Sequence, residues 1–281
     1  MMAKKKRYCF VLFMIMILSI MVCTPSYALT KRVRTMRKTT GVPNPNNYNE
    51  RKSIKYTDSV NWGRYDVEAY HKLVIPQNGR IWIAAGDGSR GFYACLCDSK
   101  YRTVQLNSTG TYVSPSYASI LAVKKGTYYI RVRGYSKYSL DATFTPLSDV
   151  GSSKSSAKYV SKTGKNTVAI MPVGESANRC DWYKFYVPYR QRVKLSYLAT
   201  GHGRLSFYLL NSSNRVLFNR QIGLTSSRSM VRRNNSIVSV KGDGLNVTAT
   251  LNRGTYYVKV MRTAENRYKR TSANSWFHWT N

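Results

Sequence analysis

Aromatic and basic residues alternate along short segments of this chain, and they carry its clearest chemical signal. Tyr129 and Arg131 stand two residues apart, and Tyr257 and Lys259 repeat the arrangement further along the chain. In an extended strand, residues two apart project from the same face. Aromatic faces stack on sugar rings or bases, and cations hold phosphate, sulfate or carboxylate groups. The spacing therefore predicts a surface suited to anionic ligands.

Two earlier segments carry the same alternation. Lys72 follows Tyr70 by two positions, and Lys184 follows Trp182 in the same way. We expect Lys72, Trp182 and Lys184 to share the outward faces with the four residues above. An alternative stays open, because aromatic and cation–π ladders between neighbouring strands stabilise sheets without any ligand.

Residues arranged for catalysis are not visible. The chain has three histidines and no recognisable nucleophile, phosphate-loop or metalloprotease motif. His71 alternates with Leu73 and Ile75, which predicts a hydrogen-bonded core histidine. Asp66 and Glu68 are expected to pair with basic neighbours rather than to act as an acid and a base. We predict a non-enzymatic protein without a cofactor.

The charge is strongly positive. The chain carries 45 basic and 12 acidic residues, a formal net charge of +33. Residues 1–28 resemble a signal peptide, with Lys4–Arg7 before the apolar run Phe10–Val22 and a small-residue ending at Ala28. A retained membrane anchor is the alternative. Without this leader the net charge is +29, which would attract polyanions to a secreted protein and hold it at a cell surface.

Residues 29–52 are interpreted as a basic, flexible arm that adds to this attraction, because Pro43 and Pro45 interrupt any regular element. Its basic residues at the start are Lys31, Arg32, Arg34, Arg37 and Lys38.

Three cysteines follow the leader, Cys95, Cys97 and Cys180, and an odd number cannot form a complete disulfide framework. Cys95 and Cys97 should share a strand face, where they are poorly placed to bond each other. Cys180 could reach one of them only across domains. Buried free thiols are the prediction, and the cysteine and histidine spacing predicts no zinc site.

Three sequence echoes occur twice in the same order. Tyr70–Pro76 matches Trp182–Pro188, Phe92–Arg102 matches Leu205–Arg215, and Gly126–Val132 matches Gly254–Val260. Each echo alternates apolar and polar residues, as half-buried antiparallel strands do. Tyr128 and Tyr256 hold matching positions, and we expect both to be core residues. We therefore predict an all-β chain with two tandem sandwich repeats, at residues 53–147 and 156–281, joined by a linker at residues 148–155. The extra residues near Thr225–Asp243 predict a longer hairpin or loop in the second repeat.

These motifs resemble the bacterial pre-peptidase C-terminal domain. The resemblance is carried by Cys180–Pro188, Leu205–Asn211 and Arg253–Val260, and more loosely by the first repeat, where Ala69 stands in the place of Asp181. It implies two tandem jelly-roll-like sandwiches in a secreted protein, with a non-catalytic role beside or in place of a peptidase. Relatives in clostridial collagenases bind collagen and calcium. The twelve acids of this chain form no cluster matching a calcium cage, so no metal site is predicted.

The expected function is a secreted, non-catalytic protein that adheres to anionic polymers of a surface or matrix. Cell-wall polymers, acidic glycans and extracellular nucleic acid all suit the charge and the aromatic residues. The alternative is an accessory or structural module that docks a partner protein or a protein substrate.

Overall fold

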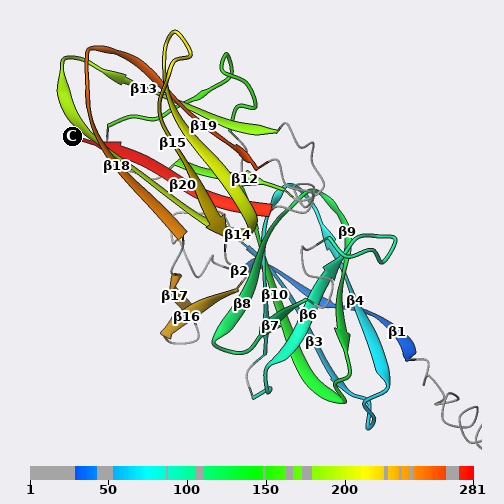
Figure 1. Cartoon of the computed structure of the whole chain (residues 1–281). Helices are drawn as coiled ribbons and strands as arrows, with labels where there is room; N and C mark the ends of the chain where they lie inside the picture. The colour runs from blue at the N-terminus through cyan, green and yellow to red at the C-terminus, as the bar shows by residue number, and fades with distance from the viewer. Residues whose placement is uncertain are drawn as a thin grey trace, which may run out of the picture. The chain divides into compact units, whose positions relative to one another are not determined.

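The computed structural model describes residues 29–42, 53–86, 88–104, 110–147, 150–162, 167–172, 179–224, 227–233, 236–240, 243–263 and 272–281. The predicted signal peptide lies outside these residues. Within them the chain is all-β and its sheets are mostly antiparallel, which confirms the predicted fold class (Figure 1). None of these residues forms a helix long and apolar enough to cross a membrane.

Residues 29–147 contribute strands to two sheets. The strands are β1 (Thr30–Thr35), β2 (Arg37–Val42), β3 (Ser53–Asn61), β4 (Val67–Ile75), β5 (Gly79–Ala85), β6 (Phe92–Cys97), β7 (Thr111–Val113), β8 (Tyr117–Val123), β9 (Gly126–Arg133) and β10 (Lys137–Pro146). One sheet has the order β1-β4-β9-β6-β7. The other runs β8-β5-β10-β3-β2 and is continued beyond β8 by β16 (Ser227–Arg233) and β17 (Ser236–Val240). The predicted longer hairpin of the second repeat is this β16–β17 pair.

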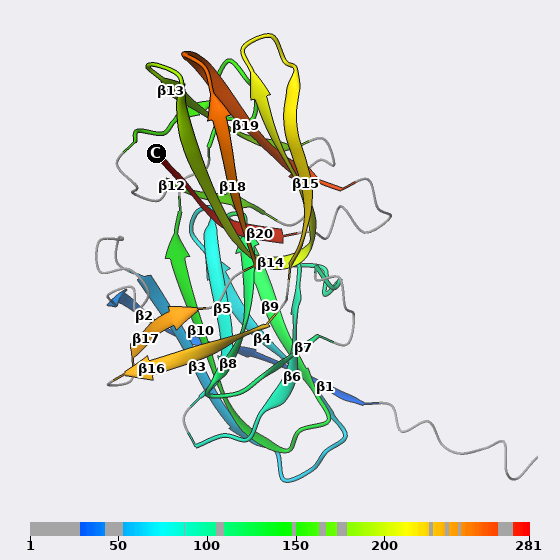
Figure 2. The same ribbon diagram turned by 60° about the vertical axis from the view of Figure 1, so that its left-hand side comes forward.

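Residues 150–281 repeat this plan around one long strand. Their other strands are β11 (Lys158–Tyr159), β12 (Thr167–Met171), β13 (Cys180–Val187), β14 (Gln191–Asn211), β15 (Val216–Leu224), β18 (Asp243–Leu251), β19 (Gly254–Arg262) and β20 (Ser272–Thr280). The first half of β14 pairs with β18 and β20, and its second half pairs with β19 and β15 (Figure 2). Strand β14 therefore takes the places of both β5 and β6. Its first half pairs with β20 as β5 pairs with β10, and its second half pairs with β19 as β6 pairs with β9.

Buried and exposed side chains alternate along the strands, and the buried ones form the apolar cores. Leu73 and Ile75 on β4 are 1% exposed, whereas Val74 between them is 53% exposed. Tyr128 and Tyr256, both predicted as core residues, are 8% exposed and belong to two separate apolar clusters. One cluster takes its buried members from residues 36–144 and the other from residues 150–279. The predicted strand phase is therefore confirmed.

The sequence echoes fall on strand pairs with the same register. Leu73 lies opposite Tyr128 where β4 meets β9, and Phe185 lies opposite Tyr256 where β13 meets β19. Matching positions of the two echoes thus have matching partners. The repeat boundaries at residues 53–147 and 156–281 stay predictions.

The predicted flexible arm is wrong for residues 30–42, which form β1 and β2. Strand β1 is the edge strand beside β4, and β2 is the edge strand beside β3, so one segment supplies an edge to each sheet. Met36 between them is 4% exposed and lies in the apolar cluster. Basic side chains suit edge strands because the backbone makes the sheet contacts while the charges stay in water. Residues 43–52 lie outside the described part.

Residues 150–155 of the predicted linker belong to the second half, whereas residues 148–149 lie outside the described part. The amide of Trp182 donates to the carbonyl of Gly151 at 2.9 Å. A Cβ at Gly151 would meet the carbonyl oxygen of Ser156 at 1.8 Å, so the turn needs glycine there. The backbone amide of Val160 donates to the backbone carbonyl of Lys184, and the amide of Met36 donates in the same way to the carbonyl of Lys72. The segment before Val160 is thus the counterpart of β1.

Replacing Met36 by Ala tests whether the arm belongs to the fold. We expect a loss of about 2–4 kcal/mol in the free energy of unfolding, because a buried apolar side chain leaves a cavity. Urea denaturation measures the loss. The control is Val33→Ala on β1, where the side chain is 50% exposed and the change should stay within ~0.5 kcal/mol. Equal stability of the two variants would contradict the role of Met36.

Candidate ligand-binding faces

The first face is the outward side of β4, β9 and β6, and it brings three predicted residues together. Lys72 lies opposite Tyr129, and Arg131 lies opposite Tyr70, on the paired strands β4 and β9. In one cross-strand pair the cation is on β4, and in the other it is on β9. Cations and aromatic rings therefore alternate across the two strands as well as along them, in a checkerboard pattern. The sequence predicted only that these residues point outward, and the pairing of β4 with β9 brings them together.

The rings of the first face are nevertheless covered. Tyr70 is 6% exposed and Tyr129 is 9% exposed. The ring of Tyr101 lies 4.9 Å from that of Tyr70 and 4.5 Å from that of Tyr129. The ammonium of Lys31 in turn lies 3.4 Å from the centroid of Tyr101. The prediction that Tyr129 offers an open ring is therefore wrong, because Tyr101 packs over it.

The second face is the outward side of β13, β19 and β14, and its rings are only half-buried. Trp182, Lys259 and Tyr208 form one cross-strand row. The ammonium of Lys259 lies 5.6 Å from the ring centroid of Trp182 and 5.9 Å from that of Tyr208. Lys184 lies opposite Tyr257 in the next row. A lysine held between two rings is positioned before any ligand arrives.

Acidic side chains are missing from the described part of the second face. Its outward residues on β13, β19, β14 and β15 include Trp182, Lys184, Tyr186, Thr255, Tyr257, Lys259, Ser206, Tyr208, Asn219 and Gln221. Among the described residues, no carboxylate forms an ion pair with Lys259. Four aromatic rings, two lysines and two amides thus adjoin one another, and the two lysine charges are not neutralised by a described carboxylate.

A lysine from the preceding segment reaches each face. The ammonium of Lys154 donates to the carbonyl of Ser212 at 2.6 Å and to Oδ1 of Asn214 at 2.7 Å. It also lies 4.5 Å from the ring centroid of Tyr257. Asn214 and Tyr101 occupy matching places in the echoes, and both have positive φ, 64° and 61°. Lys154 is therefore the counterpart of Lys31.

The basic residues of β1 and β2 serve different purposes. Lys31 covers Tyr101, and Arg34 pairs with Asp58 at 2.9 Å, so both belong to the fold. Arg32, Arg37 and Lys38 are exposed, and they form no ion pair within the described part of the chain.

Sequence reasoning missed Tyr208 and Lys154. Tyr208 alternates with the buried Phe207 and Leu209 on β14, so the phase of that echo contained the signal. Lys154 stands in a serine-rich stretch whose composition resembles a linker, and nothing in the spacing points to its contacts.

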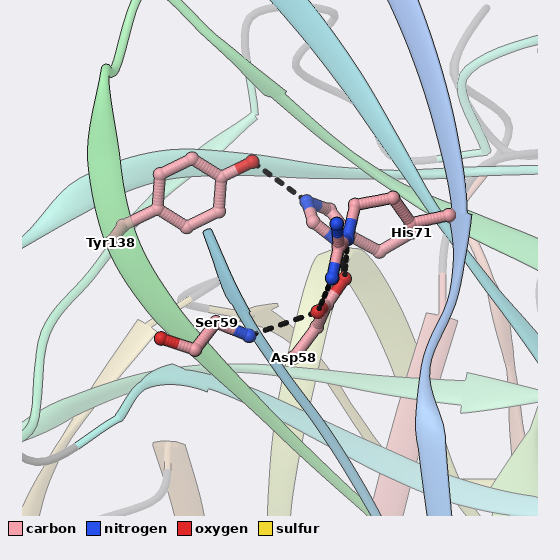
Figure 3. A network of polar contacts seen from close by, with 5 residues as sticks. Asp58, Ser59, His71 and Tyr138 are labelled. Carbon is pink, nitrogen blue, oxygen red and sulfur yellow. Dashed lines mark hydrogen bonds and ion pairs between the residues drawn. The ribbon is translucent and has the colours of Figure 1, made fainter. Parts of the chain in front are cut away.

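His71 lies at the centre of a buried polar network (Figure 3). Its Nδ1 lies 2.8 Å from Oδ2 of Asp58, and its Nε2 lies 2.7 Å from the hydroxyl of Tyr138. These residues come from β4, β3 and β10, so the network joins the two sheets. Burial opposes ionisation of Asp58, but hydrogen bonds from His71 and Arg34 outweigh it and lower the pKa of Asp58 to about 2.

The network resembles the orienting part of a hydrolase triad, but its geometry suits the core. His71 is 0% exposed and Tyr138 is 4% exposed, so no substrate atom can approach either ring from solvent. In the second half, the hydroxyls of Tyr183 and Ser275 lie 3.5 Å apart at the corresponding strands β13 and β20. The predicted hydrogen-bonded core histidine is confirmed.

Other predicted polar residues also have ordinary structural partners. Asp66 pairs with Arg64 at 3.1 Å, and Glu68 pairs with Arg131 at 3.9 Å. Within the described part of the chain, no three histidine, cysteine or acidic side chains gather as metal ligands.

The three thiols are free and buried, as predicted. Cys95 and Cys97 lie beside the tyrosines of the first face and pack against them. The hydrogen bond with Cys95, together with burial, raises the pKa of Cys97. Burial raises the pKa of Cys180 as well. Protonated thiols are poor nucleophiles, so these cysteines act as small apolar residues.

Comparisons with known proteins find only distant similarity. No family model and no curated protein matches the chain. The pre-peptidase C-terminal domain of a Bacillus anthracis collagenase is 14% identical over 48% of this chain and 100% of its own, with a TM-score of 0.28. An Arthrobacter globiformis isomalto-dextranase complexed with panose is 10% identical over 87% of this chain and 35% of its own, with a TM-score of 0.26. An insecticidal delta-endotoxin from Bacillus thuringiensis is 7% identical over 75% of this chain and 54% of its own, with a TM-score of 0.27. These similarities are too distant to indicate a function.

Acid should weaken the polar network. The folded-state pKa of Asp58 lies below its ordinary value of 3.8, so Asp58 stabilises the fold above about pH 4 and this contribution is lost as pH falls toward 2. Between pH 5 and pH 2 we expect the wild-type protein to lose about 1–2 kcal/mol more than Asp58→Asn does. The estimate is reduced because water screens the partly exposed Arg34.

Denaturant titrations across that pH range make this measurement. The matched control is Asp66→Asn, which removes a surface ion pair and should leave the pH dependence close to that of the wild type. Parallel pH profiles for Asp58→Asn and the wild-type protein would contradict the proposed role of Asp58.

Reducing agent should leave the melting temperature unchanged, because none of the three cysteines in the described part of the chain forms a disulfide. A thiol reagent should modify Cys95, Cys97 and Cys180 slowly in the folded protein and quickly in denaturant, since burial excludes the reagent. Intact-mass measurement counts the modified thiols. A lowered melting temperature in reductant, or rapid labelling of the native protein, would overturn this expectation.

Proposed function

We propose that this protein is a secreted, non-catalytic binding protein that adheres to anionic polymers of a cell surface or matrix, and that the second face makes the contact. The observation that carries the proposal is Lys259, held between Trp182 and Tyr208 on a face without described carboxylates. Such a lysine offers its charge to a ligand without first breaking an ion pair. The flanking rings supply apolar contact for the polymer beside each charge.

The charge distribution supports this assignment. Residues 150–281 contain 22 basic and 4 acidic residues, a formal excess of +18 around the second face. An excess of this size produces an attractive field that raises the local concentration of a polyanion and its rate of association. In the first half, by contrast, Asp58, Asp98 and Asp141 each neutralise a basic neighbour.

Edge strands extend the basic surface. Arg32 on β1, with Arg37 and Lys38 on β2, is exposed and has no ion pair within the described part of the chain. We expect these three residues to attract a polyanion through their charge at long range, without forming a binding site of defined geometry. Because β1 and β2 belong to the fold, their role is tested by neutralising charges rather than by deleting the segment.

A salt titration of polyanion binding tests the proposal. Retention on heparin should fall steeply as salt passes physiological strength, where charges are screened over about 8 Å. Lys259→Gln should weaken binding about fivefold, since one basic residue near an anionic surface contributes about 1 kcal/mol. Lys259→Arg should restore binding. Neutralising Arg32, Arg37 and Lys38 together should weaken binding at low salt.

Two controls separate the second face from total charge. Lys137→Gln removes an exposed lysine of β10 and should change binding less than Lys259→Gln does. Trp182→Ala keeps every charge, so weaker binding by that variant reports contact with the ring. A wild-type protein that passes through the column at low salt would eliminate the proposal. A salt-tolerant, stoichiometric protein partner would then favour the docking alternative.

A further inference from the structure

Two tyrosines at the β6–β7 edge of the first half are open to solvent. Tyr93 is 52% exposed and Tyr112 is 45% exposed, although their rings pair edge to face with centroids 5.6 Å apart. On the same sheet, Tyr70 and Tyr129 are almost fully buried. On this sheet, the exposed rings of Tyr93 and Tyr112 therefore lie next to the predicted residues rather than on them.

Two glycines leave room for this pair of rings. A Cβ at Gly91 would meet the hydroxyl of Tyr112 at 2.0 Å, so only glycine leaves room for that ring. Gly110 has a φ of +96°, and a Cβ there would meet the carbonyl oxygen of Ala94 at 2.3 Å. Both glycines allow β7 and its tyrosine to lie close against β6. The backbone thus leaves room for the ring pair at this edge.

An exposed arginine adjoins the pair. Cys95 lies opposite Arg131 where β6 meets β9, so the same register places Tyr93 next to Arg133. Arg133 is exposed, and no carboxylate in the described part of the chain forms an ion pair with it. Glu68 lies opposite it on β4 and pairs with Arg131 instead. The guanidinium of Arg133 is therefore free to bind a carboxylate or sulfate.

We propose that Tyr93, Tyr112 and Arg133 form a second binding site, which takes an acidic polysaccharide. The sugar ring stacks on a tyrosine face, the phenol hydroxyls bind sugar hydroxyls, and Arg133 binds the acidic group. Three neighbouring strands span about 10 Å, the scale of an oligosaccharide rather than of one small anion. This inference rests on the proposed function and narrows its anionic polymer to one built from rings.

The arrangement distinguishes among polyanions. A polymer without rings, such as polyphosphate, would use Arg133 and gain little from the tyrosines. A single-stranded nucleic acid stacks its bases on exposed rings, but Tyr93 and Tyr112 meet at an interplanar angle of 69° and present no two parallel surfaces. Polyphosphate and an oligothymidylate therefore serve as the discriminating probes beside an oligogalacturonate.

Calorimetric titration of the full-length mature protein tests the site. Tyr93→Ala/Tyr112→Ala should bind the oligogalacturonate about tenfold more weakly, a difference of about 1.4 kcal/mol, and should bind polyphosphate as the wild type does. Arg133→Gln should weaken both. Tyr93→Phe/Tyr112→Phe keeps the rings and should retain most of the affinity even if the alanine variant folds poorly.

The matched control is Tyr65→Ala, which removes a tyrosine that is 72% exposed and lies before β4 rather than on β6 or β7; this change should leave the affinity unaltered. Unchanged oligogalacturonate affinity in Tyr93→Ala/Tyr112→Ala would overturn the site, as would an equal loss for oligothymidylate. A wild-type protein that binds neither polyphosphate nor oligogalacturonate would instead overturn the proposed function. The two failures are therefore distinguishable.

Discussion

The fold depends on one constraint: every strand has two sides, and burying one side fixes what the other presents. Phe185 and Val187 enter the core of the second half, so Lys184 and Tyr186 must point outward. Pairing of β13 with β19 then sets Lys184 against Tyr257. The outward checkerboard is thus a geometric result of core packing and strand register. A shift of one residue in register would exchange core and surface together.

This constraint explains how far the sequence predicts the structure. Phase alone correctly placed Tyr128, Tyr256 and His71 in the core, since a residue's side of its strand depends only on near neighbours. It also placed aromatic and basic residues on outward sides, but only the strand pairing groups them into two faces. It could not show that Tyr101, from a turn, covers Tyr129. Whether an outward ring is covered depends on contacts with other segments, and the alternation within its own strand carries no information about them. For the same reason β1 and the turn at Gly151 resembled free segments, because backbone hydrogen bonds at a sheet edge require no apolar pattern.

The two halves use one plan with different chemistry. In the first, His71 joins the sheets through a charged partner, Asp58, whereas in the second a pair of hydroxyls, Tyr183 and Ser275, occupies the corresponding strands. The outward faces differ in the exposure of their rings. Tyr70 and Tyr129 on the first face are covered, whereas Trp182, Tyr208 and Tyr257 on the second face are half-buried. A covered face gains stability from its aromatic contacts, and an open one keeps its rings for a ligand. The first half thus uses its outward rings for packing, and the second half leaves its outward rings accessible.

Strands β1 and β2 have one further consequence, for solubility. Together they cover the edges of β4 and β3, each of which would otherwise expose a row of unpaired amides and carbonyls. Their own outer edges carry lysines and arginines, which repel a second copy of the same edge. A chain shortened to begin at Ser53 would retain most of its apolar core and yet present two bare edges. Its failure would appear as self-association into aggregates rather than as simple unfolding.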